Sequence, residues 1–401
     1  MIANLLLGDV MATLFPWIIG ISVAYIAIQI LQNFFLFRYK HHPEPEPGSW
    51  PEISIWVAAR DEENNIGACL ASLCALDYPT ELVQILVGND QSSDRTKDIA
   101  MEWSAKYPNI RVIDIVDNDS GLKAKARVMA QLDVHATGEF YLITDADVRV
   151  KPSWAKAMIQ SMPPNVGVAS GTTMVFANPT DKGWDYLWAK LQGIDWTYFM
   201  GLLNVISYAG VPATAVGNNM IVRKKAYWET GGYANIRFSI TEDYKLYSEI
   251  CAKGYGWNNV MFPDVLAHSV ETKGFNALLH QRKRWLSGGK ELPWYWWLLF
   301  AVFLFFYYGA PIVSMTLGVG GLLKQDLSPM LEKIQWACGL IWGIKWILQV
   351  IQINRICKNV GEPKPRIHWH LIYEIYLLVV TIGTSIFFVI PKKTVWKGRK
   401  Y

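Results

Sequence analysis

The sequence of 401 residues has few charged residues and lacks the short motifs of several large protein classes. Only 18% of the residues are charged, and 38 basic residues nearly balance 34 acidic ones, so it has no basic excess for neutralising nucleic-acid phosphates. No Gly-x-Gly-x-x-Gly follows the first predicted strand and no P-loop motif occurs, which excludes the usual dinucleotide and P-loop sites. The five cysteines lack CxxC and CxxxC spacing, so we expect reduced thiols rather than a zinc ribbon or disulfides.

Hydrophobic residues, by contrast, are abundant and fall in long runs. They make up 52% of the chain, which includes 19 tryptophans and 19 tyrosines. Residues 11–37 carry no charge, and at about 1.5 Å per residue a helix of this length can cross a hydrocarbon core of roughly 30 Å. Arg38 and Lys40 follow directly, so the positive-inside rule places the next domain in the cytosol.

Three further apolar stretches lie near the C-terminus, at residues 292–323, 334–354 and 367–390. The loop 355–366 and the tail 391–401 are both basic, so both are expected in the cytosol, which a single simple span between them does not allow. We therefore favour a re-entrant or interfacial third stretch, and the alternative is that the tail breaks the charge rule. Glu374 within it is either a functional carboxylate or one near the interface.

The middle of the chain alternates short β-rich runs with helical stretches. The runs cover residues 53–60, 83–90, 111–117 and 140–147, and this alternation predicts βαβ units with a largely parallel sheet. Polar residues follow three of the runs, and the carboxyl edge of an open α/β sheet is where ligands bind. We therefore expect these residues to converge on one crevice.

Eight stretches, taken in order, resemble the family 2 membrane glycosyltransferases, a group that includes ceramide glucosyltransferase, cellulose synthase and hyaluronan synthase. The resemblance implies an α/β GT-A (nucleotide-diphospho-sugar transferase) domain with a mostly parallel mixed sheet, set between an N-terminal transmembrane helix and a C-terminal helical membrane region. The stretches are ARDEENNI (59–66), CLASLCALDYP (69–79), GNDQSSDRT (88–96), GLKAKA (121–126), TDADV (144–148), GNNMIVRKKAYWETGGY (217–233), TEDYKL (241–246) and QRKRW (281–285).

Residue by residue, the resemblance assigns Arg60, Glu62 and Asp90 to the nucleoside of the donor. Asn89 departs from the usual Asp-Asp pair; its amide can hydrogen-bond a base or ribose but brings no charge, so a metal role is doubtful there. Lys123 matches a basic residue near the nucleotide, and the alternative for it is a solvated helix lysine.

Asp145 and Asp147 match the family's DxD pair, which implies binding of the nucleotide sugar and of a divalent cation, Mg²⁺ or Mn²⁺. Asp147 is the residue expected to contact the ion directly. Such ions use few protein carboxylates and complete their shell with diphosphate oxygens and water, and the charge neutralises the departing diphosphate. By itself a DxD sequence is also common in loops and helix caps.

Asp243 matches the catalytic base, because inversion needs a carboxylate that takes the proton from the attacking acceptor hydroxyl. The alternative for Glu242 and Asp243 is an N-terminal helix cap, and both roles can hold together. Gln281, Arg284 and Trp285 share one face of a predicted helix. The resemblance places Arg284 at the diphosphate and Gln281, Trp285 and Glu242 in the acceptor and diphosphate region.

These patterns predict an inverting hexosyltransferase that moves a sugar from a nucleotide donor, expected to be a UDP-sugar, to a membrane lipid. The tail WKGRKY resembles the ending of ceramide glucosyltransferases and favours the lipid branch. The alternatives are a processive polysaccharide synthase and a silent nucleotide-sugar sensor; nucleic acid is not an expected partner.

We expect a multi-pass protein of the cytoplasmic (cell) membrane whose catalytic domain faces the cytosol. The expected parts are an N-terminal transmembrane helix (1–37), a linker (38–50), a GT-A domain (51–290), interfacial and transmembrane helices (291–391) and a basic tail (392–401).

Overall fold

The computed structural model describes most of the chain. The described residues are 2–40, 43–117, 121–178, 180–212, 214–288, 294, 298, 329–390, 395–397 and 399–400. Most of the first C-terminal apolar stretch, 292–323, and half of the basic tail, 392–401, therefore lie outside the described residues.

A seven-stranded mixed sheet forms the centre of the soluble part, in the order β3-β2-β1-β4-β8-β6-β9. The first four strands in the sequence are parallel, and Ile53 pairs with both Val83 and Phe140, as the alternating pattern predicts. β8 runs antiparallel between β4 and β6, so the sheet is mixed. The strands are β1 (Ile53–Ala59), β2 (Val83–Asn89), β3 (Ile110–Asp114), β4 (Phe140–Asp145), β6 (Val166–Ser170), β8 (Asn219–Arg223) and β9 (Gly256–Asn259).

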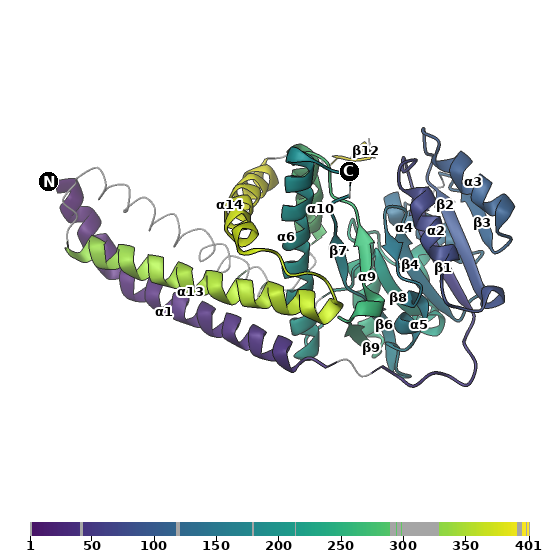
Figure 1. Cartoon of the computed structure of the whole chain (residues 1–401), viewed down its shortest axis with the longest axis horizontal. Coiled ribbons are helices and arrows are strands. Elements are labelled where there is room, and N and C mark those ends of the chain that lie inside the picture. The colour runs from purple at the N-terminus through teal and green to yellow at the C-terminus, as the bar shows by residue number, and fades with distance from the viewer. Residues whose placement is uncertain are drawn as a thin grey trace.

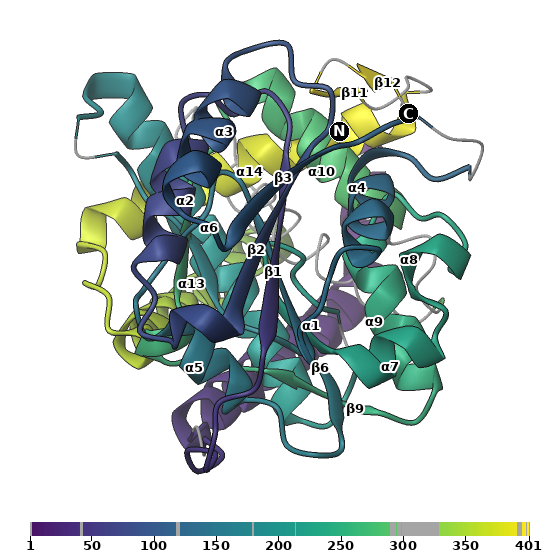
Figure 2. The ribbon, with the colours of Figure 1, turned by 90° about the vertical axis from the view of Figure 1, so that its right-hand side faces the viewer.

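Helices cover both faces of this sheet (Figure 2). Because side chains alternate along a strand, Ile55 and Val57 of β1 face one layer of helices and Trp56 faces the other. Trp56 is fully buried and stacks on Tyr141 with ring centroids 4.4 Å apart. The first layer holds α2 (Ile66–Cys74), α3 (Thr96–Lys106) and α5 (Trp154–Ile159); the second holds α4 (Ala124–Asp133), α7 (Lys224–Glu229), α8 (Gly232–Asn235) and α9 (Glu242–Ala252).

Two longer helices, α6 (Gly183–Tyr208) and α10 (Phe275–Gly288), lie between this domain and the apolar helices. α6 packs directly on β7 (Thr173–Val175), which belongs to a small sheet with β10 (Ala267–Ser269) and β5 (Arg149–Val150). The approach is close because Gly193 has no side chain: a Cβ there would lie 2.5 Å from the backbone oxygen of Val175.

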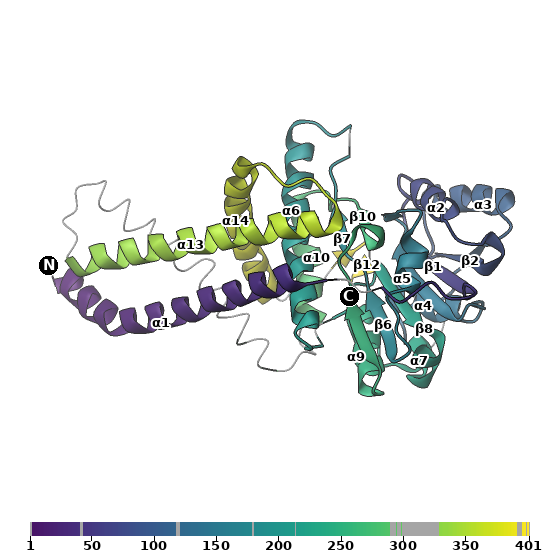
Figure 3. The ribbon, with the colours of Figure 1, turned by 60° about the horizontal axis from the view of Figure 1, so that its bottom comes forward.

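Three apolar helices complete the described chain: α1 (Ile2–Arg38), α13 (Pro329–Val360) and α14 (Ile367–Val389). Each contains a segment long and apolar enough to cross a membrane by length and composition. α1 and α13 lie side by side and project along the long axis of the molecule, away from the sheet (Figure 1). α14 runs across that axis, beside α6 and α10, in both Figure 1 and Figure 3.

Glu374 of α14 has a structural partner. Its Oε2 accepts a 2.5 Å hydrogen bond from Nζ of Lys345 on α13 and a 3.2 Å bond from the indole nitrogen of Trp342. Lys345 is fully buried, so the pair compensates two charges that would be costly if either were left alone. Glu374 therefore links α14 to α13 and does not line the large cavity at the carboxyl edge of the central sheet.

Candidate active site

The carboxyl ends of β1 and β2 bring charged side chains together. Arg60 follows β1, and its Nη1 donates a 2.7 Å hydrogen bond to the backbone oxygen of Asp90, which follows β2. The buried Asp90 carboxylate accepts a 2.7 Å hydrogen bond from Nη2 of Arg127 on α4. Arg60, Glu62 and Asp90 all line one large cavity. Arg127 was not predicted from the sequence; it does not line the cavity, but its ion pair holds the Asp90 carboxylate in place.

The loops that follow β1 and β2 each contain a residue with a strained backbone. Asp61 and Gln91, neither of them glycine, adopt left-handed conformations with φ of 50° and 56°. The Asp61 carboxylate accepts a 2.8 Å hydrogen bond from the backbone nitrogen of Ser93, which ties one loop to the other. Such conformations cost on the order of 1–3 kcal/mol and concentrate at ligand sites, where the surroundings hold them in place.

Asn89 and Lys123 do not line the cavity. The Asn89 amide donates a 2.9 Å hydrogen bond to the Asp114 carboxylate and so joins β2 to β3. Lys123 is exposed at the start of α4, whereas Lys125, two residues on, points into the cavity. The chain turns between these two lysines at Ala124, whose φ is 51°, and this turn directs Lys125 rather than Lys123 into the cavity.

Lys125 is the cation that contacts the DxD sequence. Its Nζ donates hydrogen bonds of 2.5 Å to Asp145 and 2.7 Å to the backbone oxygen of Gly217, and it lies 4.0 Å from Glu242. Burial alone lowers the pKa of Lys125, but the surrounding carboxylates, Asp145 foremost, raise that pKa above its ordinary value. Lys125 thus joins the end of β4 to the start of α9.

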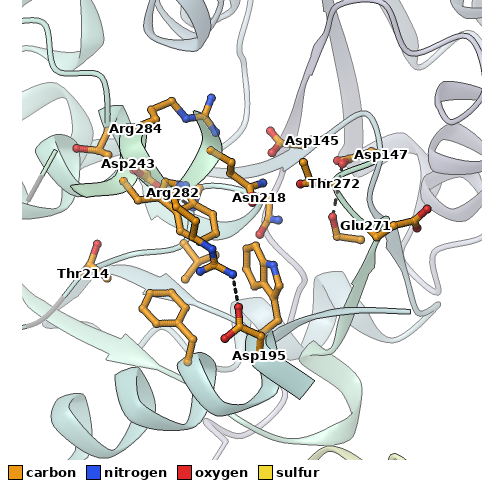
Figure 4. A pocket seen from close by; sticks show the side chains of 18 of the residues that line it. Asp145, Asp147, Asp195, Thr214, Asn218, Asp243, Glu271, Thr272, Arg282 and Arg284 are labelled. Atoms are coloured by element: carbon orange, nitrogen blue, oxygen red, sulfur yellow. Dashed lines mark hydrogen bonds and ion pairs between the residues drawn. The ribbon is translucent and has the colours of Figure 1, made fainter. Parts of the chain in front are cut away.

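Asp145 ends β4, and Asp147 lies two residues further on, so both carboxylates face the same part of the cavity (Figure 4). Oδ2 of Asp147 accepts a 3.5 Å hydrogen bond from the Ser269 hydroxyl. Burial, followed by the negative charges of Asp145 and Glu62, raises the pKa of Asp147 to about 7. Three carboxyl groups thus share this part of the cavity, those of Asp145, Asp147 and Glu62, and Lys125 and Lys397 contact two of them.

Asp243 lies in the first turn of α9, across the cavity from the DxD pair (Figure 4). Its Oδ2 accepts a 2.9 Å hydrogen bond from the backbone nitrogen of Gly217, and its Oδ1 accepts a 2.8 Å bond from that of Tyr244. Burial and the Asp243 charge raise the pKa of the neighbouring Glu242 to about 7. The N-cap of α9 is Thr241, so the expected capping role of Glu242 and Asp243 is wrong; both acids lie in the first turn, where they complement the positive end of the helix dipole.

The QRKRW stretch is helical, in α10, and Gln281, Arg284 and Trp285 line the same cavity. Trp285 meets Trp196 edge-on at 5.4 Å and stacks on Phe199 at 6.2 Å, both from α6. Arg284 lies close enough to Glu242 for its charge to lower the pKa of that carboxyl. α10 therefore places the cation Arg284 near Glu242, and its Trp285 packs against aromatic rings of α6.

The tail also reaches this site. Nζ of Lys397 donates a 2.6 Å hydrogen bond to the backbone oxygen of Arg60 and contacts the Glu62 carboxylate. Lys397 lies between the two short strands β11 (Val395–Trp396) and β12 (Arg399–Lys400). The WKGRKY ending thus contributes a side chain to the cavity at the carboxyl edge of β1.

The cavity measures about 2170 Å³ and extends from these polar groups to an apolar wall formed by helices. Lining positions on α1 and on α6 recur at helical spacing, so each helix presents one apolar face to the cavity. Representative apolar residues are Leu31 and Phe35 of α1, Phe199 and Leu202 of α6, and Leu377 and Val380 of α14. One continuous cavity therefore joins the acidic sheet edge to the helices that can enter a membrane.

The sheet order and the acids at its carboxyl edge define a GT-A-like glycosyltransferase fold. A mannosyltransferase from Pyrobaculum calidifontis, solved in complex with GDP-Man and Mn²⁺, has the same fold with a TM-score of 0.51 and 15% identity, covering 94% of this chain and 99% of that protein. The chain belongs to glycosyl transferase family 21, whose model matches residues 15–291. The enzyme class expected from the motifs, a glycosyltransferase, is confirmed; the expected family was family 2, and the family model that matches is family 21.

Similar sequences include glycolipid enzymes. A beta-monoglucosyldiacylglycerol synthase of Trichormus variabilis is 27% identical over 254 residues, which cover 63% of this chain and 52% of that protein. The synthase of the same name from Synechocystis sp. is 26% identical over 302 residues, covering 72% and 60%. The chain thus spans only about half to three fifths of the length of these relatives.

Several cavity residues were missed by sequence reasoning. Lys125 carried a signal, because it shares the GLKAKA stretch with Lys123, but spacing alone does not reveal which lysine turns inward. Asp195 and Arg282 also line the cavity, from α6 and α10. Asp195 belongs to no motif, and Arg282 lies within the QRKRW stretch at a position to which the resemblance assigns no role.

Proposed function

We propose that this chain is a membrane-bound inverting glycosyltransferase that moves a hexose from a nucleotide sugar, a UDP-sugar being expected, to a hydroxyl of a membrane lipid. The observation that carries the proposal is the single cavity that joins Asp145, Asp147, Asp243 and Arg284 to an apolar wall. A polymer-synthesising enzyme shares the acidic end but does not need a wall shaped for one lipid acceptor.

The acidic end supports binding of a divalent cation with the donor. Burial, and then the negative charges of Asp145 and Glu62, raise the pKa of Asp147, and a cation held by Asp145 and Asp147 would offset these effects. These two carboxylates fit Mg²⁺ or Mn²⁺, which take most of their other ligands from diphosphate and water. When bound, the ion would stabilise negative charge on the leaving diphosphate.

The chain's own cations support the same use of this end. Arg60 and Arg127 hold Asp90, the residue assigned to the nucleoside, in one orientation. Arg284 has the planar fork of donors that suits phosphate oxygens, and the cavity gives it access to a diphosphate held near Asp145. The donor would thus bind along the carboxyl edge of β1, β2 and β4.

Asp243 is the proposed base. Two backbone N–H groups hold its carboxylate, at 2.9 Å and 2.8 Å, which fixes it at the cavity wall. From that position it would accept the proton of the lipid hydroxyl as the oxygen attacks the anomeric carbon from the side opposite the diphosphate. Attack from that side gives inversion.

The apolar end supports a lipid acceptor. Its wall comes from α1, α6 and α14, and α1 and α14 both contain segments able to enter a bilayer. α14 lies across the direction of α1 and α13, an orientation that supports the interfacial location expected from the basic residues on both sides of it (Figure 3). With Arg38 and Lys40 on the cytosolic side, the active site would open at the inner surface of the cytoplasmic membrane.

The experiment is product analysis with the purified full chain in lipid, Mn²⁺ and a panel of UDP- and GDP-hexoses. A lipid carrying one sugar, identified by mass spectrometry, is the expected product. A ladder of growing polymer would instead identify a processive synthase. Release of free sugar from every donor, with no glycosylated lipid in any preparation, would contradict the proposed acceptor.

A further inference from the structure

Three polar side chains from three different helices meet within the cavity, between its acidic end and its apolar wall. Asp195 of α6 forms an ion pair with Arg282 of α10, and Figure 4 shows this pair below Asp243. The hydroxyl of Tyr373 on α14 donates a 3.0 Å hydrogen bond to Oδ1 of Asp195. All three residues line the cavity.

The cluster has more donors than acceptors. The contacts of Arg282 and Tyr373 engage both carboxylate oxygens of Asp195. Arg282 carries five N–H donors; its Nη2 contacts Asp195, and the hydroxyl of Tyr376 on α14 is a second polar neighbour of its guanidinium. Its Nε lies buried without a hydrogen-bond partner among the described residues. An oxygen that only accepts hydrogen bonds, such as a carbonyl, fits the donors that Asp195 and Tyr376 leave over.

Arg282 is held in place by aromatic rings. Its guanidinium carbon lies 4.6 Å from the ring centroid of Trp285, which itself stacks on Phe199. Cation–π contact and the ion pair together fix the plane of the guanidinium. About 17% of the side chain remains exposed, and since the residue lines the cavity, a ligand can reach its fork.

The electrostatics favour a neutral ligand group over a phosphate. The positive charge of Arg282 is already compensated by Asp195, and Glu242 and Asp243 contribute further carboxylates to the same cavity. A phosphate would meet this negative charge without a free cation of its own within the cluster. A neutral carbonyl oxygen would accept a hydrogen bond from Arg282 without that repulsion.

We propose that Asp195, Arg282 and Tyr373 form a carbonyl-recognition subsite for the acceptor lipid, with Arg282 donating to the ester or amide carbonyl that neighbours the reactive hydroxyl. This inference rests on the proposed lipid glycosylation. Asp195 is a positioning residue that orients Arg282, and Tyr373 fixes Asp195. The acceptor is therefore a neutral lipid whose reactive hydroxyl lies close to an ester or amide carbonyl.

The test compares lipids that differ only in this carbonyl. The full-length wild-type chain is given a diacylglycerol, the dialkylglycerol with ether links and equal chains, a ceramide, and a polyprenyl phosphate. The ether lipid should lose at least tenfold in kcat/KM relative to its ester counterpart, mostly through the acceptor KM. The diacylglycerol and ceramide arms separate the ester source of the carbonyl from the amide source.

Variants then assign the effect to the cluster. Arg282→Met should abolish the ester-over-ether preference while the dissociation constant of the nucleotide sugar stays within twofold of wild type, and Arg282→Lys should restore part of the preference. Asp195→Asn should weaken the preference, whereas Asp185→Asn, an exposed position on the same helix, should leave it unchanged. Should Arg282→Met fail to fold, Tyr373→Phe and the wild-type lipid comparison still decide the question.

The two proposals fail differently. Equal use of ester and ether lipids, an unchanged preference in folded Arg282→Met, or a preference for the polyprenyl phosphate would overturn the subsite while leaving lipid glycosylation intact. If no lipid of the panel receives a sugar, the proposed function itself is wrong.

Discussion

Asp243 and Gly217 lie so close together that the glycine has no room for a side chain. The backbone nitrogen of Gly217 donates to Oδ2 of Asp243 at 2.9 Å, and a Cβ on Gly217 would lie 2.8 Å from the Cβ of Asp243. The backbone oxygen of Gly217 accepts from Lys125, which also contacts Asp145. One glycine therefore positions the proposed base relative to the DxD end.

Gly217→Ala is the first test of this relationship. The added methyl group would push the Asp243 carboxylate away from its backbone donor, so we expect kcat to fall at least tenfold, because small displacements of reacting groups cost large factors in rate. Gly48→Ala, at a position where a Cβ meets nothing within 4 Å, is the matched control and should keep wild-type kcat. Steady-state kinetics of both variants test this prediction. Equal kcat values for the two variants would show that Gly217 does not position Asp243.

Asp243→Asn tests the base itself. Asn is nearly isosteric and its oxygen can still accept the hydrogen bond from Gly217, so the fold should persist. The amide cannot take a proton from the acceptor hydroxyl, and we expect the transfer rate to fall by about 10²–10⁴. Nucleotide-sugar binding, measured by calorimetry, should change less than threefold. A variant that turned over normally would show that Asp243 is not the base.

Asp147→Asn should act on donor binding rather than on proton transfer. Removing one carboxylate lowers the negative charge at the DxD end, and with it the affinity for a divalent cation. We expect the Mn²⁺ concentration needed for half-maximal donor binding to rise at least tenfold. Asp264→Asn, an exposed carboxylate that bonds Ser153, is the control. Donor titrations at several Mn²⁺ concentrations measure the effect, and an unchanged Mn²⁺ requirement contradicts the assignment.

The parallel half of the sheet was predictable because its strands are buried on both faces and form short apolar runs. The runs ending near Ala59, Asn89 and Asp145 became β1, β2 and β4 in register, and the acids that follow β1 and β4 entered one cavity for that reason. The antiparallel β8 lay within a recognised motif, but nothing in its spacing revealed its direction.

Side-chain direction near the helix starts was not predictable. Whether Lys123 or Lys125 enters the cavity depends on the left-handed Ala124, and no residue type at that position signals such a turn. Asp195 and Arg282 were missed for a related reason. Their pairing joins positions 87 residues apart on α6 and α10, and helical spacing describes only one helix at a time.

Glu242→Gln provides a prediction about stability and pH. Burial and the Asp243 charge raise the pKa of Glu242 in the folded protein to about 7, above its ordinary value near 4.5. Between these two values the unfolded chain loses the proton more readily than the folded one, so the wild-type free energy of unfolding should decrease as pH rises from about 4.5 to about 7. Gln has no ionisable proton, so the free energy of unfolding of Glu242→Gln should not show this decrease with pH.

The difference in Tm between Glu242→Gln and wild type should therefore increase from pH 5 to pH 8, by several degrees if the shift is worth about 2–3 kcal/mol. Thermal unfolding in detergent with EDTA is the measurement, since a divalent cation at the nearby DxD pair would alter the local charge. Glu102→Gln, at an exposed position on α3, should run parallel to wild type across this range. If the Glu242→Gln curve also ran parallel, the Glu242 carboxyl would have to be ionised in the fold, and Lys125, 4.0 Å away, would be its compensating charge.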